Sequence, residues 1–382
     1  MTGSLQQKNG KYYAVINLTD VNGKRKQKWI NTGFEVKGNK KKAEKFLRDR
    51  LKEFEAQENV LPCDILFADY VKEWLKEAKI KVDIVSFEHY EQNANNHIIP
   101  YFECRKTKLV DVSRQILQDY FNEKYENGNL KTGKGLSAKT LRHHKNIIHQ
   151  TLELALINNL ISNNPCKDIT LPKLERNVYS FFNLEETKSF LNAVKNERLY
   201  PVYYITAVFG LRRSEVLGIK WDSIDFDCKK LTIQHTRIRS NKVIEKDKTK
   251  TKTSFRSFPL PDEIICIFKE LKEEETFNKK ICGKEYVLND YVFKWENGMP
   301  YHPDYLTSRL KKDLKKYGFK DITFHGLRHS CGSMLNEQGF TLKDIQEWLG
   351  HADIQTTANI YLHLDIKRKE NISNAITNSL KF

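Results

Sequence analysis

The second half of the chain carries polar motifs that core packing does not explain. The first spans residues 210–215 (GLRRSE), where an apolar helix over 202–209 is expected to end and a new helix to begin with Ser214 as its N-cap. Arg212 would then be fixed between two apolar elements. Because a guanidinium is expensive to bury alone, an arginine in this place favours an anionic partner.

The second motif, Lys248-Thr249-Lys250-Thr251-Lys252, precedes an expected strand at residues 255–260. Lysines at alternate positions of an extended segment point to the same side. Taken alone, the pattern favours a solvated hairpin tip. The alternative is that one of these lysines reaches a phosphate or a leaving oxygen.

The third motif is His325-Gly326-Leu327-Arg328-His329. Two histidines four residues apart could bind zinc on a helix, but Gly326 stands where the H-E-x-x-H metalloproteases have glutamate, which excludes that class. A spacing of three places His325 and Arg328 on one helix face, where each could bind one non-bridging oxygen of a phosphate.

The fourth motif contains Gly350-His351, Thr356-Thr357 and Tyr361. One of the two threonines is expected to cap a helix, with Tyr361 about one turn inside it. By itself Tyr361 would be an ordinary core residue, one of seventeen tyrosines in the chain. The four motifs together are far more specific than any one of them.

A small N-terminal domain is predicted ahead of these motifs. Residues 11–18 and 24–30 have the aromatic and β-branched or alternating character of strands, joined by a hairpin signal at Asn22-Gly23. An apolar stripe predicts a helix over 41–57. We expect a three-stranded sheet plus this helix.

Alternation along the strand at 24–30 separates two kinds of side chain. Lys24, Lys26 and Lys28 lie on one face, and Arg25, Gln27 and Trp29 lie on the other. The row of lysines indicates either a solvated edge strand, protected against aggregation by its charge, or a strand that binds DNA.

Helices are predicted for the next hundred residues. They are expected at 67–75, 86–97, 111–125 and 137–160, the last capped by Ser137. Lys139, Arg142 and Lys145 cluster with His143 on the outer side of the last helix. This cluster indicates either a solvated helix face or a phosphate-binding surface. The polar residues that follow, with one proline, predict a linker between domains.

The remaining chain is mixed in character. Helices are predicted at 184–196 and 200–209, strands at 230–239 and 255–260, and further helices to the C-terminus. The predicted fold class is multidomain α+β: a small N-terminal sheet with a helix, an all-helical domain, and a mainly helical domain with a small sheet.

Composition restricts the function classes. The chain has 382 residues, 65 Lys+Arg and 49 Asp+Glu, a formal charge of +16, and a hydrophobic fraction of 39%. A core can therefore form, no apolar run is long enough for a membrane helix, and the charge favours a polyanionic partner such as nucleic acid. The seven cysteines never stand at C-x-x-C spacing, which argues against a zinc finger and fits a reducing, cytoplasmic location.

The set of motifs resembles the tyrosine recombinase (phage integrase) family, and most closely the integrases of conjugative transposons and temperate phages. The matching segments are GLRRSEVLGIKWDSIDF, KTKTKTSFRSFPL, HGLRHS and WLGHADIQTTANIYLH. The resemblance spans nearly the whole chain. It implies an arm-type DNA-binding domain at 1–60, a helical core-binding (SAM-like) domain at 63–168, a linker at 169–180 and a catalytic domain at 181–382.

The resemblance also implies the catalytic residues. By resemblance, Arg212 and Arg328 are the first and second catalytic arginines of the family, and His325 is the histidine of its H-x-x-R motif. His351 stands at the position that the family fills with His or Trp. Tyr361 corresponds to the nucleophile, and Lys250 corresponds to the hairpin lysine, with Lys252 as the alternative. Lys24, Lys26, Lys28, Lys139, Arg142 and Lys145 are the predicted DNA contacts.

The activity implied is cutting and rejoining of DNA through a 3′-phosphotyrosine, so that a mobile element is integrated and excised. No cofactor or metal is expected, because fixed cations take the charge of the reacting phosphate and the covalent bond conserves the energy of the cut ester. The implied partners are double-stranded attachment or transposon-end DNA and a homotetramer on that DNA, with an excisionase and a host DNA-bending protein as further candidates. A cytoplasmic, nucleoid-associated location is expected, and no membrane partner.

Three alternatives remain open at this point. A type IB topoisomerase would use the same chemistry only to relax supercoils, and the N-terminal sheet disfavours it. A non-enzymatic DNA-binding regulator would use these residues only to bind phosphates. A Mg²⁺-dependent transposase would be sensitive to a chelator, which we do not expect.

Overall fold

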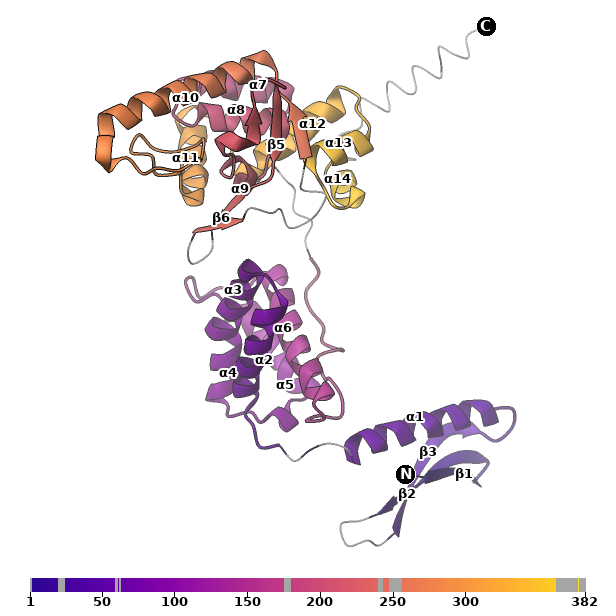
Figure 1. The fold of residues 1–382 in the computed structure, drawn as a ribbon. Helices are drawn as coiled ribbons and strands as arrows, with labels where there is room; N and C mark the ends of the chain where they lie inside the picture. The colour runs from indigo at the N-terminus through magenta and orange to yellow at the C-terminus, as the bar shows by residue number, and fades with distance from the viewer. Residues whose placement is uncertain are drawn as a thin grey trace. The chain divides into compact units, whose positions relative to one another are not determined.

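The computed structural model describes residues 2–19, 25–58, 61, 63–174, 180–239, 243–246, 256–361 and 377. It divides into two compact units, Met1–Arg176 and Asn177–Phe382. Figure 1 shows the first unit in indigo to magenta and the second in magenta to yellow. No described helix has both the length and the apolar character that a membrane crossing requires.

The N-terminal part is an antiparallel sheet with one helix on it (Figure 1). Its elements are β1 (Thr2–Lys8), β2 (Lys11–Thr19), β3 (Arg25–Glu35) and α1 (Lys40–Glu58). A tight turn at Asn9-Gly10, both with positive φ, joins β1 to β2. The predicted sheet-plus-helix architecture is confirmed, although β3 continues five residues beyond the expected strand end. The predicted hairpin at Asn22-Gly23 lies outside the described residues.

The two faces of this sheet differ in what covers them. Ile16 packs against α1 and is the cross-strand partner of Lys28, so the face with the predicted lysines is the one that carries the helix. The opposite face shows a polar ladder, in which Gln27 Nε2 donates to Asn17 Oδ1 (3.1 Å) and Asn17 Nδ2 donates to Thr2 Oγ1 (3.1 Å). Trp29 on this open face is 48% exposed.

The following part is a helical bundle with an aromatic core. Its helices are α2 (Phe67–Lys81), α3 (Ile84–Asn93), α4 (Ile99–Cys104), α5 (Arg114–Asn127) and α6 (Ala138–Ile157). Ser137 caps α6 as predicted. A π-helical turn, Ala94–Ile98, joins α3 to α4, so helical structure continues to Cys104, beyond the helix end expected at 97. The helix also begins at Ile84, two residues before the expected start. The predicted apolar face of α2 is buried.

The second unit packs helices around two small sheets. The helices are α7 (Leu184–Ala193), α8 (Tyr200–Phe209), α9 (Arg213–Val216), α10 (Asp262–Cys282), α11 (Pro303–Lys316), α12 (Phe324–Glu337), α13 (Leu342–Leu349) and α14 (Ile354–Tyr361). One sheet has the order β4 (Ile224–Asp225), β5 (Lys230–Ile233), β8 (Arg256–Pro259), and the other pairs β6 (Thr236–Arg239) with β7 (Val243–Lys246). The strand predicted at 230–239 is therefore two strands in different sheets.

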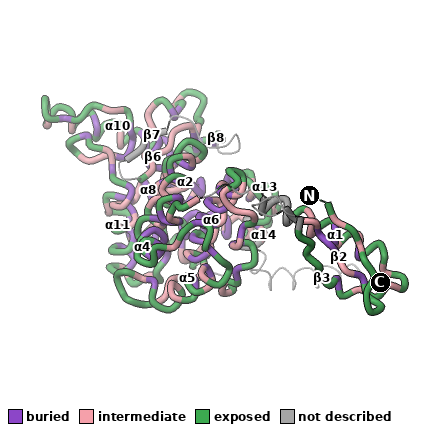
Figure 2. The backbone as a smooth tube through the Cα atoms, turned by 90° about the horizontal axis from the view of Figure 1, so that it is seen from below, coloured by how far each residue is buried: buried purple, intermediate pink, exposed green. Residues whose placement is uncertain are grey.

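The core of this unit lies among α7, α8, α11, α12 and the β4-β5-β8 sheet. Helix α8 supplies buried residues along most of its length, whereas α10 is mostly exposed beyond Phe268, as its predominantly green trace in Figure 2 indicates. Two of the predicted catalytic residues, Arg212 and His351, come directly after the ends of α8 and α13, and two others, His325 and Arg328, lie in α12.

Candidate active site

Gly210 allows the chain to turn sharply at the end of α8. It has a left-handed conformation (φ 59°), and a Cβ at this position would come within 2.2 Å of Leu349 Cδ2. The turn makes Arg212, and not the predicted Ser214, the N-cap of α9. The prediction was wrong because Glu215 closes the first turn, accepting a hydrogen bond from Arg212 N (2.8 Å).

Arg212 is held from two sides. Its Nη1 donates to Glu215 Oε1 (2.6 Å), and its Nη2 donates to the carbonyl of Gly350 (2.9 Å). The side chain remains 34% exposed, so part of its guanidinium faces solvent. Arg212 is therefore fixed in orientation and still accessible to an anion.

Arg328 lies fully buried in the first turns of α12. Its Nη1 donates to the carbonyl of Gly210 (2.8 Å) and its Nη2 to the carbonyl of Leu349 (2.5 Å). These carbonyls belong to the C-terminal ends of α8 and α13, where free carbonyl groups and the helix dipole favour a cation. The ends of two helices thus replace the water that the guanidinium loses on burial.

Glu215 is the acidic centre of this cluster and is only 2% exposed. Arg256 from β8 binds both of its oxygens (3.2 and 2.9 Å), and Arg328 Nη1 lies 3.7 Å from Oε2. Burial alone would raise the pKa of Glu215, but the charges and hydrogen bonds of Arg256, Arg212 and Arg328 lower it to about 2.

Glu215 and Arg256 were not singled out from the sequence, although both leave a signal there. Glu215 is the only acid in the first motif and precedes an apolar run. Arg256 alternates with Phe258 and Leu260, which are buried, so it occupies a core-facing strand position. An arginine at such a position requires a buried carboxylate.

Two histidines lie on the first turns of α12, which Thr323 caps. The rings of His325 and His329 meet edge to face with centroids 4.5 Å apart. The His325 side chain reaches the surface, although neighbouring protein atoms keep water from much of its ring, and His329 is buried. Desolvation, with the charge of Arg328, lowers the pKa of His325 to about 4, and desolvation next to His325 lowers that of His329 to about 3. Both rings are neutral at pH 7.

His351 follows the left-handed Gly350 that ends α13. It is buried, and its Nδ1 lies 2.9 Å from Thr357 Oγ1. Desolvation, together with the charges of Arg328 and Arg212, lowers the pKa of His351 to about 3. A neutral His351, oriented by Thr357, is thus held next to both arginines.

Tyr361 is the last residue of α14, one turn after Thr357. This helix begins at Ile354, so neither Thr356 nor Thr357 caps it, and Thr357 instead lies buried within it. The side chain of Tyr361 lies outside the described part of the structure. Lys250 and Lys252 also fall in the undescribed range 247–255, and the choice between them stays a prediction.

An open cavity of about 450 Å³ borders the arginine cluster. Its lining includes Arg212, Arg213, Arg237, Arg239 and His325. Arg213 donates to Thr307 Oγ1 (2.8 Å), and Asp304 lies beside Arg213 and Arg239 (3.9 and 2.5 Å). The cavity therefore offers mainly basic side chains where an anionic strand could approach Arg212.

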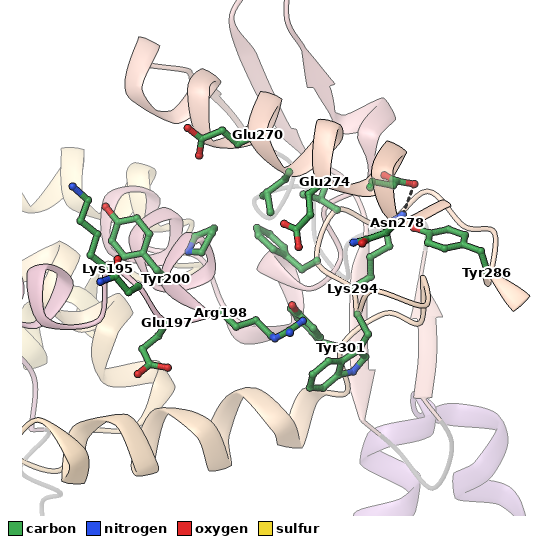
Figure 3. A pocket seen from close by; sticks show the side chains of 17 residues that line it. Lys195, Glu197, Arg198, Tyr200, Glu270, Glu274, Asn278, Tyr286, Lys294 and Tyr301 are labelled. Atoms are coloured by element: carbon green, nitrogen blue, oxygen red, sulfur yellow. Dashed lines mark hydrogen bonds and ion pairs between the residues drawn. The ribbon is translucent and has the colours of Figure 1, made fainter. Parts of the chain in front are cut away.

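A second cavity, of about 440 Å³, lies elsewhere in the unit (Figure 3). Glu274 of α10 lines it together with Lys294 and Tyr301 from the segment between α10 and α11. Its charges are largely paired, since Lys294 binds the buried Glu275 at 2.7 Å. The residues that line it include none of the predicted catalytic side chains. Among the described residues, no three His, Cys, Asp or Glu side chains come together as a metal-binding group.

The predicted DNA contacts in the first unit differ in whether their side chains are exposed or already bound to the protein. Lys26, Lys28 and Lys139 are exposed, and Lys24 lies outside the described residues. Arg142 Nη1 donates to the carbonyl of Pro172 (2.9 Å) and Lys145 Nζ to the carbonyl of Ile169 (3.0 Å). These two side chains hold the first residues of the predicted linker against α6, where Ile169 is buried.

The chain is similar to known recombinases along most of its length. Residues 180–368 match the phage integrase family, and residues 66–125 match the N-terminal SAM-like domain of phage integrases. A "tyrosine recombinase XerC-like" protein of Caldanaerobacter subterraneus subsp. tengcongensis is 32% identical over 390 residues, 95% of each chain. The ICEBs1 integrase of Bacillus subtilis is 25% identical and covers 78% of this chain and 80% of its own.

Among solved structures, the Tn1549 transposon integrase in complex with a circular intermediate DNA has the same fold. It superimposes with a TM-score of 0.66 at 19% identity, over 81% of this chain and 99% of that one. Together with the full-length match to a tyrosine recombinase, these similarities show that the chain belongs to the phage integrase family of tyrosine-type site-specific recombinases.

Proposed function

We propose that this protein is an integrase that cuts and rejoins DNA through a 3′-phosphotyrosine at Tyr361. The observation that carries the proposal is the convergence of Arg212, Arg328 and His351 at the ends of α8, α12 and α13, next to the helix that ends at Tyr361. These donors are fixed by the fold before any substrate binds. Such preorganised donors favour a transition state in which negative charge develops.

In the cleavage step, Tyr361 Oη attacks a backbone phosphorus and the bond to the 5′ oxygen breaks. The phenolic proton passes to a base, and the 5′ oxygen takes a proton as it leaves. His325 is the candidate base, because its side chain reaches the surface beside the arginine cluster and a neutral imidazole can accept the phenolic proton. A lysine of the undescribed hairpin, Lys250 or Lys252, would supply the proton for the leaving oxygen.

Arg212 and His351 would bind the non-bridging oxygens, and the fully buried Arg328 would stabilise their charge from behind them. A planar guanidinium matches two oxygens at once, and in other phosphoryl-transfer enzymes one such group changes the rate about 10³- to 10⁵-fold. Rejoining is the reverse reaction, in which a different 5′ hydroxyl attacks the phosphotyrosine. The ester bond is conserved at each step, so we expect a requirement for neither ATP nor a divalent metal.

The other domains would place the DNA. We propose that residues 1–60 bind arm-type sites, with the open sheet face of Asn17, Gln27 and Trp29 toward the DNA, because α1 covers the opposite face. Lys26 and Lys28 point to the face that carries α1, so on this proposal they contact only phosphates at the margin of the interface, and Lys24 stays a predicted contact. Residues 63–168 would bind the core site, with Lys139 as a phosphate contact.

We further propose that the protein works as a homotetramer that joins two attachment or transposon-end duplexes. Integration and excision of a mobile element follow from the same chemistry with different pairs of sites. An excisionase and a host DNA-bending protein would then bias the direction. Such an enzyme would act in the cytoplasm, at the nucleoid.

Covalent trapping tests this proposal. Duplexes of randomised sequence, each with a nick that lets the short fragment with the new 5′ hydroxyl diffuse away, are incubated with the full-length protein, and adducts that survive denaturation are selected. We expect adducts in the presence of EDTA with the natural protein, and none with Tyr361→Phe, which should still bind the selected duplex. A phenylalanine variant that forms adducts, or a wild-type protein that forms none, would exclude the proposed chemistry.

A further inference from the structure

Arg256 makes an enclosed contact with a single carboxylate, that of Glu215. Its guanidinium spans both oxygens of Glu215, at 3.2 and 2.9 Å, and the two side chains are only 9% and 2% exposed. Removing two charges from water costs several kcal/mol per ion, and a pair of well-packed apolar residues usually serves stability as well. A buried pair next to catalytic groups therefore suggests a use beyond stability.

The other contacts of Glu215 indicate what that use is. The same carboxylate also binds Arg212 at 2.6 Å and lies 3.7 Å from Arg328. Three guanidinium groups around one carboxylate leave an excess of two positive charges, while the neighbouring histidines are neutral. A phosphodiester carries one negative charge in the ground state and gains a second as the pentavalent transition state forms.

Without Arg256, this balance would change. The charge of Glu215 would be shared between Arg212 and Arg328 alone, and the excess would fall to one positive charge. Both arginines would also be drawn toward the carboxylate and away from an incoming phosphate. Because the site is shielded from water, such a change in charge has a larger effect here than at the surface.

We propose that Arg256 is a positioning residue for strand cleavage: it occupies both oxygens of Glu215, so that Glu215 orients Arg212 without neutralising the two catalytic arginines. This inference rests on the proposed function, since it concerns the rate of the same cleavage step. Arg256 itself does not contact the substrate. Its effect is transmitted through Glu215, across the junction between β8 and α9.

A simpler role for Arg256 is to anchor β8 to α9. Both roles predict that Arg256→Met lowers stability, so stability alone does not distinguish them. The positioning role also predicts a slower chemical step with little change in DNA affinity, and partial recovery in Arg256→Lys. A lysine keeps the charge next to Glu215 but lacks the fork that binds both oxygens.

The test measures single-turnover cleavage and DNA dissociation constants for full-length variants on a duplex selected by the wild-type protein. We expect Arg256→Met to slow cleavage about 10- to 100-fold, by analogy with the loss of residues that orient metal ligands in metalloenzymes. The DNA dissociation constant should stay within about threefold of wild type. Arg256→Lys should fall between the two. If Arg256→Met does not fold, the lysine variant carries the test.

Arg309→Met is the matched control. Arg256 binds both oxygens of one carboxylate, whereas Arg309 binds two carboxylates, Asp313 at 2.8 Å and Glu197 at 2.5 Å, in a cluster separate from the catalytic arginines. We expect this variant to lose stability while its cleavage rate stays near wild type. Equal cleavage rates in wild type, Arg256→Met and Arg256→Lys would overturn the positioning role and leave the proposed function intact. Failure of the wild-type protein to form an adduct would overturn both.

Discussion

Replacing Glu215 by glutamine is expected to destabilise the unit Asn177–Phe382 strongly. The substitution keeps the shape of the side chain but leaves Arg212, Arg256 and Arg328 together without their shared negative charge. The magnitude follows from the pKa of Glu215, about 2 in the folded protein against an ordinary value of 4.5. At about 1.4 kcal/mol per pKa unit, the difference corresponds to about 3 kcal/mol of lost stability.

Hydrogen exchange measured by mass spectrometry reports this loss for the relevant helices. The free energy of opening in peptides from α8 and α12 should fall by about 3 kcal/mol in Glu215→Gln at pH 7. Glu275→Gln is the control, because Glu275 also binds buried partners, including Lys294 at 2.7 Å, but lies outside the arginine cluster. We expect the control to lose stability and keep cleavage. A change below about 1 kcal/mol in Glu215→Gln would refute the shared-carboxylate account.

The same shift in pKa predicts an acid response with a defined sign. The folded pKa of Glu215 is lower than its unfolded value, so its contribution to stability is complete above pH 4.5. That contribution is lost as the pH falls from 4.5 to about 2. The stability difference between wild type and Glu215→Gln should therefore shrink over this interval, and a difference that grows instead would contradict the assignment.

Three further predictions concern single positions. If Lys250 is the general acid, Lys250→Ala should cleave normal DNA slowly. It should regain its rate on DNA with a 5′-bridging phosphorothiolate, because the sulfur leaves without needing a proton. Rescue of Lys252→Ala, and not of Lys250→Ala, would assign the role of general acid to Lys252. Gly210→Ala should cost about 2–5 kcal/mol of unfolding free energy in urea denaturation, from the left-handed backbone and a Cβ 2.2 Å from a side-chain carbon of α13. Gly318→Ala, also left-handed but with no atom beyond its chain neighbours within 4 Å of the new Cβ, should cost about 1–2 kcal/mol in the same measurement. Lys139→Ala should reduce the salt dependence of DNA binding by about one phosphate contact, and an unchanged slope would remove Lys139 from the interface.

Local patterns predicted the elements that carry the site. The bounds of α8 follow from its apolar run and from Gly210, and the three-residue spacing of His325 and Arg328 correctly placed both on the first turns of α12. The helical bundle was predicted with similar success because its apolar positions keep the period of a helix. These features depend on residues close in sequence.

The features that were missed depend on residues far apart in sequence. Arg256 and Glu215 are 41 positions apart, and Arg212 reaches a carbonyl 138 positions away. No local pattern encodes such pairings. The wrong N-caps have a local cause instead. Glu215 accepts from Arg212 N three positions away and closes α9 without Ser214, and Thr357 lies against His351 six positions away inside a helix that begins earlier, at Ile354.

Identification of the residue joined to DNA tests the central claim most directly. The trapped adduct is digested with a protease and a nuclease, and the peptide that retains a nucleotide is sequenced by mass spectrometry. The account predicts a 3′-phosphate esterified to Tyr361 in the peptide that contains the end of α14, formed equally well in EDTA. Attachment through another side chain, attachment to a 5′-phosphate, or dependence on a divalent metal would contradict it.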